Sequence, residues 1–208
     1  MGLLEKFRRR DAPTEAGQPQ PWHATAAAAR HHYQAGLELL GQGLYEEALA
    51  ELRHAARETP DHSLVYFNMG LAHDQLCRYA KAVECYERAV QLDPDFAEAY
   101  SGLGLAHSRM GRSAEAIKAC LRAIRLDPNY LEGYSTLALA YYNMGCYADA
   151  TKACNKALAL DPDHAPTHYT LGLIYLDLND KVQADAEHKT LLKLDPALAE
   201  HLYYLISR

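Results

Sequence analysis

The sequence predicts an all-α protein assembled from repeated pairs of helices. Three regularities carry this prediction: a proline recurs every 34 residues, small residues recur at fixed places between the prolines, and the apolar residues follow a helical period. Proline cannot continue a helix and holds the residue before it extended, so a regular proline spacing divides the chain into equal helical units. The prolines are Pro60, Pro94, Pro128, Pro162 and Pro196.

Each unit contains two helical segments separated by a turn. In the third unit, Tyr100, Leu103 and Gly104 fall on one helical face, and Ala116 and Ala123 share a face of the following segment. Glycine or asparagine between the two segments favours a turn there. Positions within the repeat are numbered from the first residue of each unit: Ala29, Ser63, Ala97, Leu131 and Ala165.

Small residues at two positions predict that the two helices of a unit lie close together. A leucine at either position would hold the helices apart, whereas glycine or alanine lets them approach. The eighth position holds Gly36, Gly70, Gly104, Ala138 and Gly172. The twentieth position holds Ala48, Ala82, Ala116, Ala150 and Ala184.

These features resemble the tetratricopeptide repeat family. The resemblance rests on the 34-residue length, an aromatic-x2-Leu-Gly start, a mid-unit tyrosine (Tyr45, Tyr79, Tyr147), the alanines and the closing proline. It covers residues 29–198. The resemblance implies a right-handed superhelical solenoid of five helix pairs with a closing helix.

Three segments are expected along the chain. Residues 1–24, rich in Pro and Gln with a basic tip, should form a flexible arm. Residues 25–198 should form the array, and residues 199–208 should close it with an amphipathic helix. The expected repeats are 29–62, 63–96, 97–130, 131–164 and 165–198.

The resemblance also implies a partner-binding groove lined by the first helix of each repeat. The ninth position is leucine in all five units, and a row of apolar side chains rimmed by polar ones is typical of a partner site. The alternative is that these leucines belong to the core. The expected groove residues are Leu37, Phe67, Asn68, Leu71, Leu105, Arg109, Leu139, Tyr142, Tyr169 and Leu173.

The net charge, the apolar runs and the cysteine count of the chain limit which partners and which cellular compartment we expect. A net charge of -6 argues against a nucleic-acid binder, and no apolar run is long enough to span a bilayer. Five cysteines, an odd number without a CxxC pair, favour a reducing cytoplasm. Residues 1–10 combine three apolar residues with a net positive charge, so contact with an anionic membrane surface is an alternative to the flexible arm, which we favour.

The sequence predicts neither an enzyme nor a bound cofactor or metal. No phosphate-binding loop is present, and the acidic residues recur at surface positions of the repeat. His73, Cys77 and His107 have suggestive spacing, but zinc sites usually need four such ligands and tyrosines take the same place in later units. These residues are therefore interpreted as packing variants.

The expected function is that of a non-catalytic adaptor that binds a partner helix or extended peptide. One alternative is a self-associating scaffold, in which the arm or the Tyr203–Tyr204 end of one copy enters the groove of another. A further alternative is an accessory subunit of a glycosyltransferase or secretion complex, since a fold does not define a function.

Overall fold

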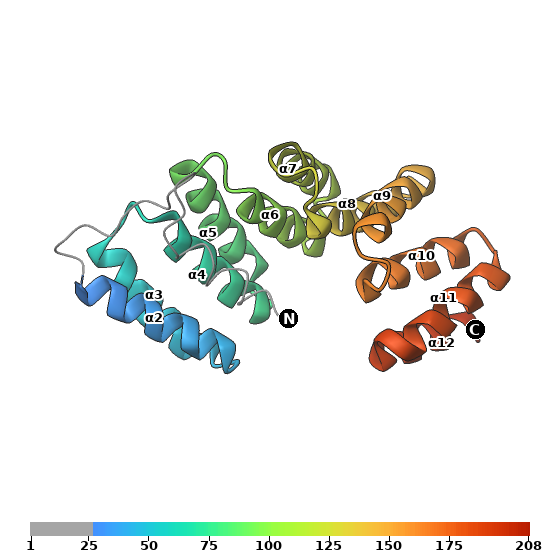
Figure 1. The fold of residues 1–208 in the computed structure, drawn as a ribbon, viewed down its shortest axis with the longest axis horizontal. Coiled ribbons are helices and arrows are strands. Elements are labelled where there is room, and N and C mark those ends of the chain that lie inside the picture. The colour runs from blue at the N-terminus through green and yellow to red at the C-terminus, as the bar shows by residue number, and fades with distance from the viewer. Residues whose placement is uncertain (1–26) are drawn as a thin grey trace. The chain divides into compact units, whose positions relative to one another are not determined.

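The computed structural model describes residues 27–208, so the predicted arm over residues 1–24 lies outside the described part. Eleven helices follow one another in residues 27–208, and no strand lies among them (Figure 1). The described residues divide into two compact units, one that ends at Pro94 and one that begins at Asp95. The predicted all-α repeat fold is confirmed.

The first unit contains two helix pairs within its described residues. Each pair is joined by a short turn, and α3 also packs against α4. The helices are α2 (Ala27–Gly41), α3 (Tyr45–Glu58), α4 (Ser63–Gln75) and α5 (Tyr79–Leu92).

The second unit contains three helix pairs and a final single helix. The first helices of its pairs lie next to one another, since α6 contacts α8 and α8 contacts α10. The helices are α6 (Ala97–Arg109), α7 (Ser113–Leu126), α8 (Leu131–Asn143), α9 (Tyr147–Leu160), α10 (Ala165–Asp177), α11 (Lys181–Leu194) and α12 (Pro196–Ile206).

In every helix pair, the turn between the two helices contains one residue with a positive φ, in the left-handed region. This residue is the fifteenth of its repeat. Three of these residues are glycines, for which a positive φ carries no steric penalty. Asn179 has φ 60° and Cys77 has φ 55°. Asparagine tolerates this conformation, but Cys77 adopts it at a cost of about 1 kcal/mol, which the surrounding repeat must offset. Because the sequence predicts these turns from glycine or asparagine, it does not predict the positive φ of Cys77.

The close approach of paired helices is visible at the eighth position. A Cβ atom added to Gly70 would lie 2.6 Å from the Tyr86 ring, and one added to Gly36 would lie 2.8 Å from Leu52. No real Cβ atom tolerates such contacts, so glycine is what allows α2 to pack on α3 and α4 on α5. The small residues that define the repeat in the sequence thus set the helix spacing.

The closing helix α12 begins at Pro196, three residues before the expected start at Ala199. The Asp195 carboxylate accepts hydrogen bonds from the backbone N–H groups of Ala197 and Leu198, which caps the helix, and proline fits its first turn. The earlier LDP motifs continue into Asp or Asn, which favour a turn, whereas here alanine follows and the helix starts at once.

Candidate partner-binding site

Five leucines occupy the ninth position of the repeats, and we call them the leucine row: Leu37 and Leu71 in the first unit, and Leu105, Leu139 and Leu173 in the second. All five are half-buried. The seventh-position leucines of the second unit, only two residues earlier on the same helices, are buried: Leu103, Leu137 and Leu171 are 9%, 5% and 4% exposed. Within each unit, the ninth position therefore lies at the boundary between core and surface.

The structure buries two of the predicted site residues, Phe67 and Asn68. Phe67 packs against Tyr86, with ring centroids 5.7 Å apart. Asn68 is fully buried, and its Nδ2 donates to the Tyr33 hydroxyl at 3.1 Å and to the Leu64 carbonyl at 2.8 Å. Asn68 thus links α4 to α2, so both residues support the first unit from inside.

Tyrosine and aspartate border the leucine row where α8 and α10 end. Asp177 is exposed, and its carboxylate accepts a hydrogen bond from the Tyr147 hydroxyl at 3.0 Å. Half-buried Tyr142 lies beside Tyr147, with ring centroids 6.0 Å apart. Burial and the neighbouring Asp177 charge raise the pKa of Tyr142 to about 12, and the bond to Asp177 raises the pKa of Tyr147. Both phenols therefore stay protonated at neutral pH.

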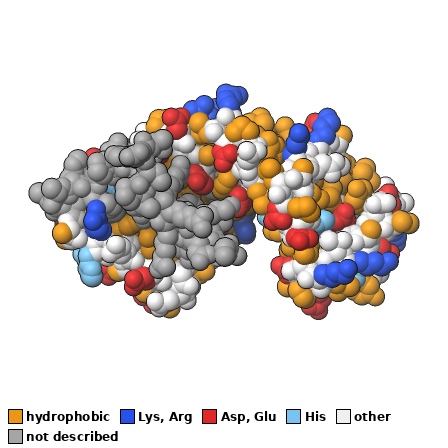
Figure 2. Space-filling model, viewed as in Figure 1, with side chains coloured by type: hydrophobic (Ala, Val, Ile, Leu, Met, Phe, Trp, Pro, Cys, Tyr) orange, Lys and Arg blue, Asp and Glu red, His pale blue; other side chains and the backbone are white. Residues whose placement is uncertain are grey.

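The remaining predicted residues are also accessible. Tyr169 is half-buried, its hydroxyl bonds to the His201 ring on α12, and burial raises its pKa. Arg109 is exposed at the end of α6. On the face of the second unit drawn in Figure 2, hydrophobic side chains reach the surface between charged ones.

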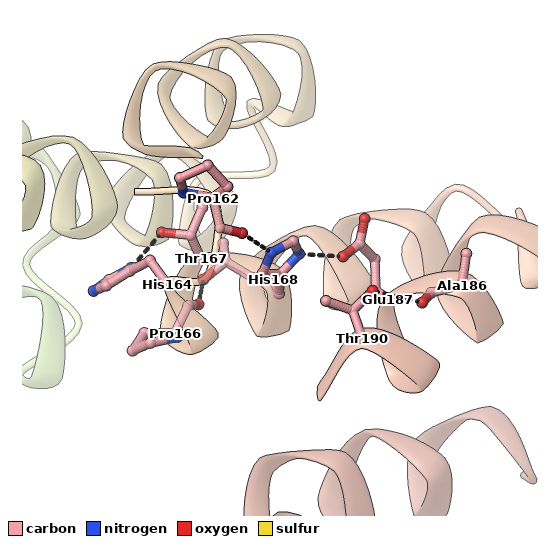
Figure 3. A network of polar contacts seen from close by, with 9 residues as sticks. Pro162, His164, Pro166, Thr167, His168, Ala186, Glu187 and Thr190 are labelled. Carbon is pink, nitrogen blue, oxygen red and sulfur yellow. Dashed lines mark hydrogen bonds and ion pairs between the residues drawn. The ribbon is translucent and has the colours of Figure 1, made fainter. Parts of the chain in front are cut away.

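A polar network around His168 fixes the start of the fifth repeat (Figure 3). The His168 Nδ1 lies 2.7 Å from the Glu187 carboxylate on α11, and its Nε2 lies 2.8 Å from the Pro162 carbonyl in the preceding loop. Tyr66 makes the corresponding bond in the second repeat, since its hydroxyl donates to the Pro60 carbonyl at 3.1 Å. His168 is therefore a structural residue.

Histidine and cysteine side chains are the remaining candidates for a metal site. No group of three His, Cys, Asp or Glu side chains in that range is placed to hold a metal ion. His73 is buried, and burial lowers its pKa, as it does for His62 and His164. Burial raises the pKa of Cys120 to about 12, so this thiol is a core residue without nucleophilic character.

Family models match most of the described chain. Models described as tetratricopeptide repeat match residues 33–84, 97–130, 131–164 and 153–186, and one described as TPR repeat matches residues 78–111. The chain belongs to the tetratricopeptide repeat family. No curated protein sequence matches this tetratricopeptide repeat protein. None of its helices from residue 27 onward is long and apolar enough to cross a membrane.

Several solved structures share the fold. The thermophilic TPR protein TTC0263 from Thermus thermophilus has a TM-score of 0.75 at 21% identity, covering 87% of this chain and 100% of that chain. MamA (41-end) from Desulfovibrio magneticus RS-1 has a TM-score of 0.70 at 23% identity, covering 82% and 97%. YrrB, described as a TPR protein with an unusual peptide-binding site, has a TM-score of 0.64 at 18% identity and covers 98% of each chain.

Three residues of this surface, Tyr147, Asp177 and His201, were not among the predicted site residues. Tyr147 is one of the mid-unit tyrosines that recur in the repeat, so the sequence suggests only a structural role for it. Its bond to Asp177 is not apparent from the sequence. His201 belongs to the closing helix, where only the apolar residues carry a periodic signal. Both contacts join side chains at least 30 residues apart, and a single-helix pattern does not predict such pairs.

Proposed function

We propose that this tetratricopeptide repeat protein is a non-catalytic adaptor that binds a helix or extended segment of a protein partner along the part of the leucine row in the second unit, Leu105, Leu139 and Leu173. The observation that carries the proposal is that all five ninth-position leucines are half-buried, whereas the seventh-position leucines of the second unit are buried. Half-buried apolar side chains bordered by polar ones can bury further apolar area when a partner docks. Tetratricopeptide repeats are typically interaction modules, which supports the adaptor class.

Preorganisation is the proposed source of affinity. Glycines let α2, α4 and α6 pack closely on the helices that follow them, and His168 ties the start of α10 to the Pro162 loop. A rigid face loses little conformational entropy on binding, so burial of the partner's apolar side chains contributes more of its free energy to affinity. We place this activity in the cytoplasm, where thiols such as the five free cysteines stay reduced.

A second candidate is self-association through the closing helix. Tyr203 is 57% exposed and Tyr204 is 51% exposed on α12, and Leu192 on α11 is 53% exposed. Large aromatic side chains at a surface are common anchors of protein interfaces. In this candidate the partner is another copy of the same chain.

Capture from native cell extract tests the proposal with the full chain as bait. Replacing Leu105 and Leu139 with arginine should reduce partner recovery by about tenfold or more, because two charges would enter an apolar contact. The matched control replaces Leu121 and Leu160, exposed leucines on second helices, with arginine and should retain the partner.

Three results of the capture are informative. Loss of a distinct protein only with the leucine-row variant supports the adaptor. Recovery of a second copy of the bait chain, lost when Tyr203 and Tyr204 are replaced by serine, supports self-association. Equal recovery by the leucine-row variant and the control contradicts binding through the leucine row.

A further inference from the structure

The tyrosine–aspartate cluster, defined as Tyr142, Tyr147 and Asp177, adjoins two members of the leucine row. Tyr142 follows Leu139 by three residues on α8, and Asp177 follows Leu173 by four residues on α10, so each lies one helical turn from a leucine on the same face. Tyr147, the first residue of α9, links α9 to α10 through its bond to Asp177, and its ring lies beside that of Tyr142 on α8. A segment lying on these leucines would therefore pass beside the cluster.

We infer that the tyrosine–aspartate cluster is a subsite for an arginine side chain of the partner segment. The inference rests on the proposed function, since it specifies what the same face recognises. The expected partner is a protein segment in which an arginine lies next to apolar residues.

Charge is the first argument for a cation at this place. Asp177 is exposed, and within residues 27–208 no lysine or arginine forms an ion pair with it. The hydrogen bond from Tyr147 orients the carboxylate but leaves its full negative charge. Because both neighbouring phenols keep their protons, the cluster carries one fixed negative charge that faces solvent.

The aromatic rings supply the second argument. The face of a tyrosine ring attracts a cation, and the half-buried rings of Tyr142 and Tyr147 lie at an interplanar angle of 42° beside the carboxylate. A guanidinium group is flat enough to stack on such a ring while two of its N–H groups meet a carboxylate. A lysine ammonium can satisfy the charge but cannot stack in this way.

The same chemistry already occurs inside this molecule. The Arg122 guanidinium lies 5.8 Å from the centre of the Tyr100 ring and 3.6 Å from the Asp95 carboxylate. In that arrangement a tyrosine face and an aspartate hold one arginine supplied by the chain itself. The cluster at Asp177 offers the same two groups, and the described residues supply no arginine to fill it. We therefore assign that place to a partner's arginine.

The experiment uses the full chain and three fluorescein-labelled peptides that share one leucine–serine sequence and differ only in the central residue: arginine, lysine or glutamine. Fluorescence anisotropy gives each Kd. The arginine peptide should bind about five- to tenfold more tightly than the glutamine peptide, as expected for one cation–π contact and one exposed ion pair. The lysine peptide should fall between them.

Two substitutions locate the preference. Asp177→Asn, which keeps an acceptor for Tyr147, should reduce the difference between the arginine and glutamine peptides to about twofold, because only the ring contact remains. Asp185→Asn removes the same charge from an exposed position on α11 and should leave the difference unchanged. Tyr142→Leu keeps the apolar surface and should weaken only the arginine peptide.

The outcomes separate this inference from the proposed function. Equal Kd values for all three peptides, together with weaker binding by Leu139→Arg, overturn the arginine subsite and leave the leucine row as the binding face. A preference that persists in Asp177→Asn, or equal binding of lysine and arginine, also overturns the assignment. Absence of binding by every peptide contradicts the leucine row and this inference together.

Discussion

Replacing Leu202 with alanine is expected to lower the free energy of unfolding of the C-terminal repeat by about 3 kcal/mol. Leu202 on α12 is fully buried in a cluster with Leu191 and Ala199. Its Cδ2 would lie only 2.5 Å from a Cβ atom added to Gly172, so the leucine fills the space that this glycine leaves on α10. Urea unfolding followed by circular dichroism and native-state hydrogen exchange measures the loss.

A second substitution tests the reason for this loss. The nearest atoms to a Cβ added at Gly172 all belong to Leu202. Gly172→Ala should therefore destabilise the wild-type chain, yet stabilise the Leu202→Ala variant by about 1 kcal/mol, since alanine favours the helix and partly fills the cavity. Tyr203→Ala, at an exposed neighbour, is the control and should change little. The same sign for Gly172→Ala in both backgrounds would contradict this packing.

Replacing Gly104 with leucine should destabilise the second unit by about 3 kcal/mol. A Cβ atom at this position would lie 2.5 Å from the Cys120 sulfur and 3.2 Å from the Ala116 carbonyl, so α6 and α7 would have to separate. The change affects the interior of the unit, and urea unfolding measures it. Ala114→Leu introduces the same leucine side chain at an exposed position of α7 and should be tolerated.

Gly104→Ala should be much milder than the leucine variant. The next repeat pairs Ala138 with Cys154 at the same two positions, and both are fully buried. The fold therefore accommodates one methyl group opposite a cysteine by a small adjustment of the helices. Destabilisation by Gly104→Ala as large as that by Gly104→Leu would mean that α6 and α7 cannot make this adjustment.

The sequence predicts the helix pairs because the same packing constraint recurs along the chain. Gly36, Gly70 and Gly104 each lie against a side chain of the following helix, with no room for a Cβ atom. The small residues that recur in the sequence are therefore the residues at which the paired helices make contact. The leucine row is likewise readable from its position in the repeat. Its half-burial is a property of the assembled helices and requires the structure.

Contacts between consecutive repeats were not predictable in this way. Asn68 was an expected site residue, yet it is buried because its amide meets a tyrosine hydroxyl 35 residues away on α2. The bond of Tyr147 to Asp177 similarly joins consecutive repeats. Helical periodicity predicts on which face of its helix a residue lies. It does not predict which side chain of a neighbouring repeat the residue contacts. The helix α12 starts at Pro196 because Ala197, a good helix former, follows this proline in place of the Asp or Asn that follows the earlier LDP prolines.

Thermal melting of Leu139→Arg beside Leu137→Arg tests most directly whether the leucine row is a surface. The two leucines stand two residues apart on α8, one half-buried and the other 5% exposed. We expect Leu139→Arg to melt within about 4 °C of wild type, a loss near 1 kcal/mol, and Leu137→Arg to unfold the unit, because it buries an unpaired charge. If Leu139→Arg unfolds the chain as Leu137→Arg does, the leucine row is core and the proposed binding face is wrong.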